Sequence, residues 1–232
     1  MITTENFELI EKNEHFIVIN KFHDVNFHDE GEINSGLFNQ VKQQLALDDL
    51  FPVHRLDKMT SGLIIFARNK ETAASFQTIF SEHTIEKYYL AISDQKPKKK
   101  QGLIKGDMEK SRRGAWKLLR TCKNPAISQF FSFGIGRGLR LYLIKPHSGK
   151  THQIRVALSS IGAQILGDPL YGKSLADRGY LHAYALRFTL NNINYQYIQQ
   201  PNSGMEFKKL LGNNTENLAQ VSSPWDLAWP KI

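Results

Sequence analysis

The chain has 232 residues, 41% of them hydrophobic, which is enough apolar material for one large domain or two small ones and excludes a disordered chain. Thirty Lys and Arg against 22 Asp and Glu leave a net charge of +8, which favours a polyanionic partner such as nucleic acid. The single cysteine, Cys122, excludes an intrachain disulfide and a zinc site built from cysteines.

The N-terminal stretch "MITTENFELIEKNEHFIVINK" carries acidic residues where a signal peptide would carry basic ones. No apolar run reaches the length of a membrane span. We therefore expect a cytoplasmic protein that makes no membrane contact.

The first third of the chain predicts strands and helices in alternation. Residues 7–20 predict two short strands around a Lys-Asn-Glu turn, and residues 62–68 predict a buried strand. Ser35 is expected to cap a helix through residues 36–47, and a second helix is expected over residues 71–83. Apolar residues recur at helical spacing in both helices: Leu37, Val41 and Leu45 in the first, and Ala73, Phe76, Ile79 and Phe80 in the second.

The rest of the chain is richer in strands, which are expected over residues 86–93, 128–135, 139–146 and 180–190. Residues 151–162 predict a short helix that ends at Gly162. Because strands and helices are mixed without a regular βαβ rhythm, the pattern predicts an α+β fold with a largely antiparallel mixed sheet and flanking helices. We expect one domain over residues 1–232.

A basic arm over residues 95–120 stands out by composition, because its excess of basic over acidic residues equals the net charge of the whole chain. Basic side chains that neutralise phosphates release counterions, and an aromatic side chain can stack on an unpaired base. We predict that the arm contacts RNA, and the alternative is a solvated hairpin kept soluble by its charge. The predicted contact residues are Lys98, Lys99, Lys100, Arg112, Arg113 and Trp116.

The stretch "VHRLDKMTSGLIIFAR" (residues 53–68) places Asp57 just before a Thr-Ser-Gly turn. No second carboxylate lies near Asp57 in the sequence, so a paired-carboxylate glycosidase site is not indicated locally. The structural alternative is that Asp57 accepts backbone hydrogen bonds in a turn with Thr60 and Ser61.

Four further stretches follow in order: "KYYLA" (87–91), "PHSGKTHQIRVAL" (146–158), "GDPLYG" (167–172) and "LHAYALRF" (181–188). Together with the first stretch they resemble the RluA-type pseudouridine synthases, whose signature is His-Arg-Leu-Asp-x-x-Thr-Ser-Gly. The related small-subunit type has Gly in place of the first His, so His54 points to the RluA branch. The resemblance extends from about Phe16 to Phe188.

The resemblance implies a pseudouridine synthase fold with a central basic cleft and an RNA partner, either ribosomal or transfer RNA. It implies an isomerase that flips a uridine out of structured RNA, breaks the bond from N1 to ribose C1′, turns the base and rejoins it through C5. Because no atom is gained or lost, the reaction needs no cofactor and no metal.

By the same resemblance, Asp57 is the catalytic aspartate, Arg155 pairs with it and Tyr89 stacks on the uracil ring. An ionised carboxylate serves as a nucleophile or as a general base, and the sequence leaves both roles open. The alternative for Arg155 is an ordinary surface arginine on a helix. Tyr88 points to the other side of the strand and is the better core candidate.

Three further residues are expected to contact RNA. Arg55 is expected to help fill the space left by the flipped base. Lys87 is expected to bind phosphate, with the alternative that it begins its strand from solvent, and His152 is expected in or beside the pocket. His54, His152 and His182 lack the spacing of metal ligands, so no metal site is predicted.

The chain departs from the family pattern at Lys21-Phe22, where Lys-Pro is frequent, at Ala157, where His is frequent, and in the basic arm. We expect no separate S4-type RNA-binding domain before Phe16, and a monomer. Two competing hypotheses are a non-catalytic RNA-binding protein on the same fold, such as an RNA chaperone, and a ribosome-associated structural protein.

Overall fold

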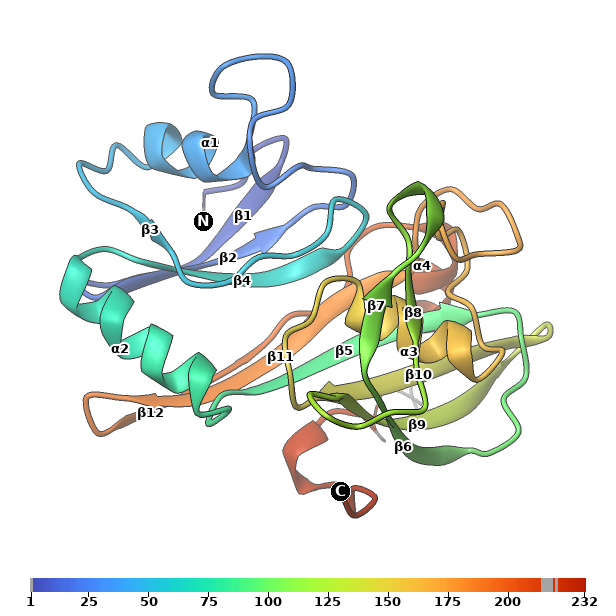
Figure 1. Ribbon diagram of the computed structural model, residues 1–232. Coiled ribbons are helices and arrows are strands. Elements are labelled where there is room, and N and C mark those ends of the chain that lie inside the picture. The colour runs from blue at the N-terminus through green and yellow to red at the C-terminus, as the bar shows by residue number, and fades with distance from the viewer. Residues whose placement is uncertain (1, 214–218, 220) are drawn as a thin grey trace. The chain divides into compact units, whose positions relative to one another are not determined.

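The computed structural model describes residues 2–213, 219 and 221–232, and the chain divides into two compact units (Figure 1). The first unit consists of residues 1–85 and 183–200, and the second of residues 86–182 and 201–232. The single catalytic domain expected from the sequence stays a prediction.

In the first unit, strands β1 (Phe7–Lys12), β2 (Phe16–Lys21), β4 (Ser61–Ala67) and β11 (Leu181–Leu190) follow one another in the sheet. β3 (Phe51–Pro52) pairs with β4, and β12 (Ile193–Ile198) pairs with β11. The pairs β1–β2, β2–β4 and β11–β12 are antiparallel. Every residue of β2 and of β4 is buried, as their nearly continuous apolar runs predicted.

Two helices belong to the first unit, α1 (Leu37–Gln44) and α2 (Lys70–Ser81). Phe76 of α2 is fully buried and meets Phe16 of β2 edge to face, with ring centroids 5.9 Å apart, so the predicted apolar face of this helix is confirmed. The prediction that Ser35 caps α1 is wrong. Gly36 occupies the cap position, and its N–H donates to the Asp29 carboxylate because the preceding loop folds back, while the Ser35 hydroxyl donates to the carbonyl of Glu32.

In the second unit, β5 (Glu86–Ser93), β10 (Leu139–Pro146), β9 (Ala126–Gly136) and β6 (Gln101–Gly106) lie in that order, each pair antiparallel. β7 (Met108–Lys110) and β8 (Trp116–Leu118) form a separate two-stranded hairpin around the short 3-10 turn η1 (Arg112–Gly114). The remaining elements are α3 (Gln153–Ser160), α4 (Met205–Asn213) and the 3-10 turn η2 (Pro224–Asp226). The basic arm is therefore a strand, β6, followed by a hairpin.

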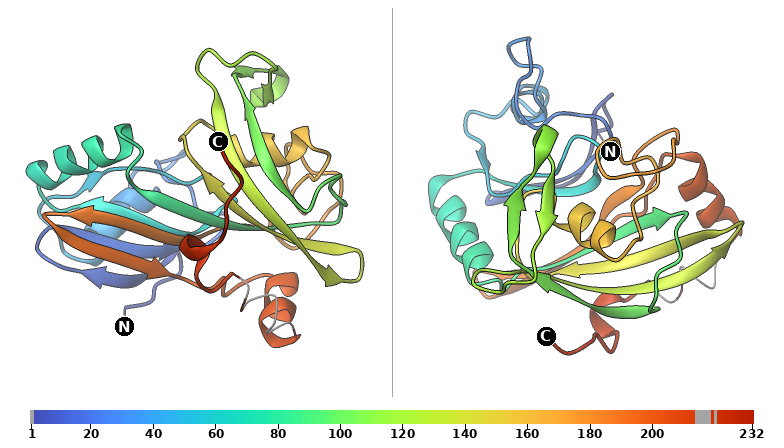
Figure 2. Two further views of the ribbon diagram at one scale, coloured as in Figure 1. Left: turned by 90° about the horizontal axis from the view of Figure 1, so that it is seen from below. Right: turned by 45° about the vertical axis from the view of Figure 1, so that its right-hand side comes forward.

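The two faces of this sheet are covered differently. α3 packs against β9 and β10, and the chain's last residues cross the opposite face (Figure 2). Tyr88 of β5 is fully buried against Trp225 and Trp229 of that C-terminal segment, so the prediction of Tyr88 as a core residue is confirmed. Because successive residues of a strand point to opposite faces, Tyr89 lies on the face that carries α3.

The fold is α+β with a largely antiparallel sheet, as the sequence predicted. The strands over 86–93 and 139–146 match their predicted bounds, and α3 ends as expected, with Gly162 in the left-handed region at φ +76°. None of the described helices is long and apolar enough to cross a membrane.

Candidate functional site

Asp57 lies in the loop between β3 and β4 and is half-buried. The N–H of Thr60 donates to the backbone carbonyl of Asp57 at 3.0 Å, so main-chain atoms close the turn. Gly62 follows with φ +112°, and a Cβ at this position would lie 2.2 Å from the carbonyl oxygen of Ala183. The glycine of the Thr-Ser-Gly turn is therefore required by the close approach of β11.

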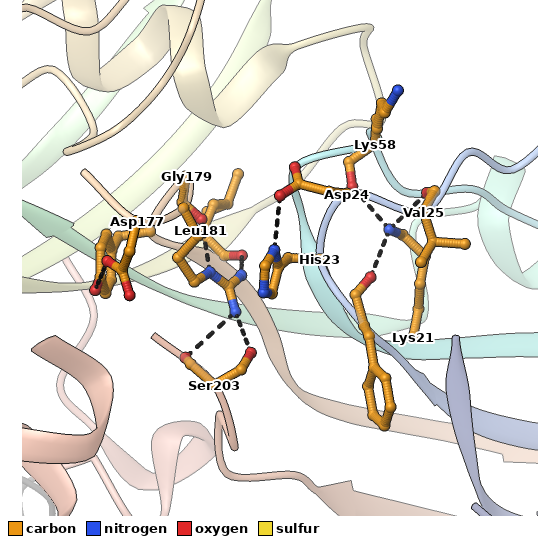
Figure 3. A network of polar contacts seen from close by, with 12 residues as sticks. Lys21, His23, Asp24, Val25, Lys58, Asp177, Gly179, Leu181 and Ser203 are labelled. Atoms are coloured by element: carbon orange, nitrogen blue, oxygen red, sulfur yellow. Dashed lines mark hydrogen bonds and ion pairs between the residues drawn. The ribbon is translucent and has the colours of Figure 1, made fainter. Parts of the chain in front are cut away.

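Lys21 anchors this loop through hydrogen bonds to backbone carbonyls. Its side chain is fully buried at the end of β2, and its Nζ donates to the carbonyls of Phe22 at 2.8 Å, Val25 at 2.8 Å and Lys58 at 2.9 Å (Figure 3). An ammonium group has three N–H donors, and these three carbonyls match them in number. The backbone next to Asp57 is thus tied to the segment that leaves β2.

Replacing Lys21 by Met should lower the free energy of unfolding by about 2–4 kcal/mol, because three carbonyls lose a charged donor. Urea denaturation of the intact chain measures this change. The matched control is Lys58→Met, which removes an exposed ammonium and leaves the Lys58 carbonyl in place, and should cost under about 0.5 kcal/mol. Equal losses in the two variants would contradict the role given to Lys21.

His54 and Arg55 precede Asp57 in the same loop. The Nε2 of His54 accepts the N–H of Ile65 at 2.9 Å, which fixes a neutral imidazole with its proton on Nδ1, and its ring packs against Phe80 with centroids 5.1 Å apart. His54 therefore fastens the loop to β4. Arg55 is exposed beside it, where a bound polyanion would find it accessible.

In the second unit, Arg155 of α3 is buried, with only 5% of its surface exposed, so the alternative of a surface arginine is wrong. Its Nε and Nη2 donate to the two carboxylate oxygens of Asp168 at 2.7 and 2.8 Å. Such a two-point pair fixes the plane of the guanidinium as well as its position. The amides of Leu170 and Tyr171 also donate to Asp168 Oδ1.

Burial by itself raises the pKa of Asp168, but the hydrogen bonds and charge of Arg155, with the amides of Leu170 and Tyr171, outweigh it and leave that pKa below its usual value. The carboxylate therefore stays ionised at neutral pH. A charged Asp168 in turn holds the charged Arg155 in a buried place.

The stretch "GDPLYG" forms the loop that carries Asp168. Gly167 has φ +71°, and a Cβ there would lie 2.0 Å from the carbonyl oxygen of Arg178. Arg178 is itself buried and donates to backbone carbonyls and one hydroxyl, those of Gly179, Leu181 and Ser203 (Figure 3).

Lys87 and Tyr89 lie on one face of β5, two residues apart. Tyr89 is half-buried, whereas Lys87 is only 8% exposed, so the alternative that Lys87 begins the strand from solvent is wrong. Burial lowers the pKa of Lys87 to about 8. The contact of Lys87 with phosphate stays a prediction.

The basic residues of the arm are exposed. Lys98, Lys99 and Lys100 lie just before β6, and Arg112 and Arg113 lie in the turn of the hairpin of β7 and β8. Trp116 is half-buried, with the Nζ of Lys110 6.0 Å from its ring centre. The solvated hairpin and the RNA contact predict the same exposure of the bases, so the choice between them rests on binding measurements.

His152, just before α3, has a left-handed backbone at φ 57° and places Nδ1 3.0 Å from the hydroxyl of Tyr171. The second unit thus brings together His152, Arg155, Asp168 and Tyr171, while the first unit gathers Lys21, His54 and Lys58 around the Asp57 loop. The pairing of Asp57 with Arg155 stays a prediction. Within the described part of the chain, no group of three or more His, Cys, Asp and Glu side chains is placed to hold a metal ion.

Residues 15–160, which contain Asp57, Tyr89 and Arg155, match the family model described as RNA pseudouridylate synthase. The chain belongs to this family. The match confirms the RluA-type resemblance, and members of the family are isomerases that act on RNA.

Relatives of known sequence and structure agree with this assignment. A Haemophilus influenzae protein named an uncharacterized RNA pseudouridine synthase is 54% identical over 188 residues, which are 80% of this chain and 84% of that one. The ribosomal large subunit pseudouridine synthase C of Rickettsia bellii is 33% identical over 176 residues, 74% of this chain and 58% of its own length. The solved structure of human RNA pseudouridylate synthase domain containing 1 superposes with a TM-score of 0.71 at 25% identity, covering 87% of this chain and 86% of that one.

Three structural residues of this pseudouridine synthase are not evident from the sequence. Asp168 carries only a weak signal for a substrate role, Tyr171 carries none of its own, and Lys21 stands out only as part of a departure from the family pattern. The signal for the first two is the stretch "GDPLYG" itself, whose Gly, Asp and Pro are typical of a turn. For Lys21 the signal is a lysine at the end of a strand that begins with four apolar residues.

Proposed function

We propose that this pseudouridine synthase isomerises one or more uridines in a structured RNA, after flipping the target base out of its stack. Large-subunit ribosomal RNA is the first RNA to test, because the Rickettsia bellii relative is named for it, and transfer RNA is the second. Unstacking costs a few kcal/mol, so a loop or bulge is the favoured context. Its monomeric state and cytoplasmic location are expectations from the sequence.

In the proposed reaction the bond from uracil N1 to ribose C1′ breaks and a bond from C5 to C1′ forms. The C5 proton leaves to solvent and N1 regains a proton, so the product has the composition of the substrate. Asp57 acts as the nucleophile or as the general base in this sequence of steps. Tyr89 stacks on the uracil ring, and Arg55, Lys87 and His152 contact the RNA.

The observation that carries this proposal is the buried two-point pair that Arg155, a residue of the family-matched region, makes with Asp168. The pair uses the Nε and Nη2 donors, two of the five N–H groups of a guanidinium, and so does not by itself use up Arg155. We propose that the same guanidinium pairs with the Asp57 carboxylate in the RNA-binding form. Asp168 then supplies the fixed direction that this second pairing needs.

The proposal is tested by mapping pseudouridine in ribosomal and transfer RNA from cells with and without the gene, using carbodiimide adducts that stop reverse transcriptase. We expect at least one site to disappear without the gene and to be restored by wild-type protein. If every site persists, the proposed RNA targets are wrong and the hypothesis of a non-catalytic RNA-binding protein gains support.

Replacing five exposed basic residues of the arm by Gln should weaken RNA binding and make it less dependent on salt concentration. The plot of the logarithm of the association constant against log salt has a negative slope. The magnitude of this slope should decrease by about 0.7–0.9 for each phosphate that the arm no longer neutralises. The bases are Lys98, Lys99, Lys100, Arg112 and Arg113. Titration of bulk RNA from about 50 to 200 mM salt measures the slope.

The control for this change replaces two exposed lysines of the C-terminal region, Lys208 and Lys231, by Gln. Their removal should change the slope much less than the removal of a matched pair from the arm. Equal slopes for wild type and the arm variant would contradict the RNA contact and support the alternative that the arm is a solvated hairpin.

A further inference from the structure

Tyr171 lies where the hairpin, the start of α3 and the Asp168 loop meet. Its hydroxyl accepts the backbone N–H of Trp116 in β8 at 2.8 Å and lies 3.0 Å from Nδ1 of His152. β8 runs beside α3 within the second unit (Figures 1 and 2). One hydroxyl therefore joins the strand of the basic hairpin to the N-cap residue of the helix that carries Arg155.

The rest of Tyr171 contacts the buried ion pair. The guanidinium carbon of Arg155 lies 5.0 Å from the centre of the Tyr171 ring, and the Tyr171 amide donates to Asp168 Oδ1 at 3.0 Å. A guanidinium over an aromatic face is attracted by the ring quadrupole, most strongly where water is excluded. Tyr171 thus touches both members of the pair with its ring and backbone, and touches the hairpin with its hydroxyl.

The chemistry of a phenol suits this linking position, because its oxygen accepts hydrogen bonds while its proton is donated. With the Trp116 N–H as donor, the hydroxyl either donates to a neutral His152 Nδ1 or accepts from a protonated one. In both cases the same oxygen joins Trp116 to His152. His152 holds a left-handed backbone, which is strained for a non-glycine residue, and the bond helps to keep it there.

We propose that Tyr171 is a positioning residue that couples the β7–β8 hairpin to Arg155. RNA bound by the basic side chains of this hairpin then fixes the guanidinium of Arg155 for reaction. The inference rests on the proposed function, in which the hairpin binds RNA and Arg155 acts on Asp57. The coupling uses a backbone N–H of β8, so a shift of the hairpin strand reaches the Tyr171 hydroxyl whichever base the RNA presents to Trp116.

The test is a double-mutant cycle with Tyr171→Phe, which keeps the ring over Arg155 and removes the hydroxyl, and the hairpin pair Arg112→Gln with Arg113→Gln. Dissociation constants and single-turnover tritium release are measured with C5-labelled bulk RNA from cells that lack the protein, the latter at saturating RNA. In the wild-type background the double change Arg112→Gln with Arg113→Gln should raise the Kd for RNA. It should also slow tritium release at saturating RNA about 5- to 10-fold. Tyr171→Phe should slow the reaction by a similar factor.

The decisive result is the combined variant. The hairpin changes should still raise Kd in the Tyr171→Phe background, but should slow the bound reaction no further, because the link is already broken. Independent, multiplying effects on the rate would overturn the coupling. Tyr197→Phe, which removes a 2.6 Å bond to Glu11 in the first unit, is the matched control and should leave rate and Kd unchanged.

A second readout does not depend on catalysis. Hydrogen exchange of the Trp116 amide and of residues 107–121 should be faster in Tyr171→Phe than in wild type or Tyr197→Phe, because the amide loses its acceptor. Unchanged exchange would overturn the link. If wild type releases no tritium the proposed function fails, and hydrogen exchange with and without bulk RNA then decides whether RNA at the hairpin protects the start of α3 through Tyr171.

Discussion

Asp57→Asn should abolish pseudouridine formation while leaving the fold and RNA binding in place. An amide has nearly the shape of the carboxylate but is neither a nucleophile nor a base at neutral pH, so we expect a loss of at least about 10³-fold. The backbone carbonyl of Asp57 keeps its bond from Thr60, and Lys21 keeps its bond to Lys58. The loop should therefore hold its form without the carboxylate.

Pseudouridine is separated from uridine by chromatography of nuclease-digested RNA after single-turnover incubation, and binding is followed by filter retention. Asp49→Asn removes an exposed carboxylate from the same unit and is the matched control, with both properties expected to match wild type. Isomerisation that persists in Asp57→Asn would refute the catalytic role. Loss of binding and activity together would instead assign Asp57 to RNA recognition.

Asp168→Asn should lower the free energy of unfolding by about 3 kcal/mol at pH 7, because it removes the charge that balances a buried guanidinium. The same change should slow isomerisation, since Arg155 loses its fixed direction. Urea denaturation and single-turnover assays measure the two effects. The control is Glu109→Gln, which breaks the exposed ion pair with Lys117 and should cost under about 1 kcal/mol.

The pH dependence of the Asp168 effect has a definite sign. Because the folded pKa of Asp168 lies below its ordinary value of 3.8, its contribution to stability is fully present above that value and is lost as pH falls through the folded pKa. Wild type and Asp168→Asn should therefore converge only below about pH 4. Convergence near pH 6, or a loss no larger than that of Glu109→Gln, would contradict the buried charged pair.

Local pattern was enough to predict several elements. β4 is an apolar run that is buried throughout, β10 has a buried apolar centre between turn signals, and α3 is a short helix closed by Gly162. The hairpin strands β7 and β8 and the edge strand β6 lack this signal. Their basic composition indicated an arm and concealed the strand pairing.

The candidate site was predictable as a set of motifs but not as a set of contacts. The sequence marked Arg155 and the "GDPLYG" turn separately, 12 residues apart from Arg155 to Gly167, and their union depends on how the chain returns after α3. Lys21 looks like a polar strand end, and nothing in the sequence shows that three carbonyls converge on it. Contacts between side chains and distant backbone are set by tertiary packing, which a single sequence does not encode as a local pattern.

Tritium release from RNA labelled at uracil C5 tests the central claim most directly, because the C5 hydrogen is lost when that carbon bonds to the ribose. Bulk ribosomal and transfer RNA from cells that lack the protein is incubated with the purified wild-type chain without added cofactor. The proposed function predicts release that rises with time to a plateau set by the number of target uridines. No release from either RNA, under conditions where the protein binds it, would contradict uridine isomerisation and leave RNA binding as the activity of this chain.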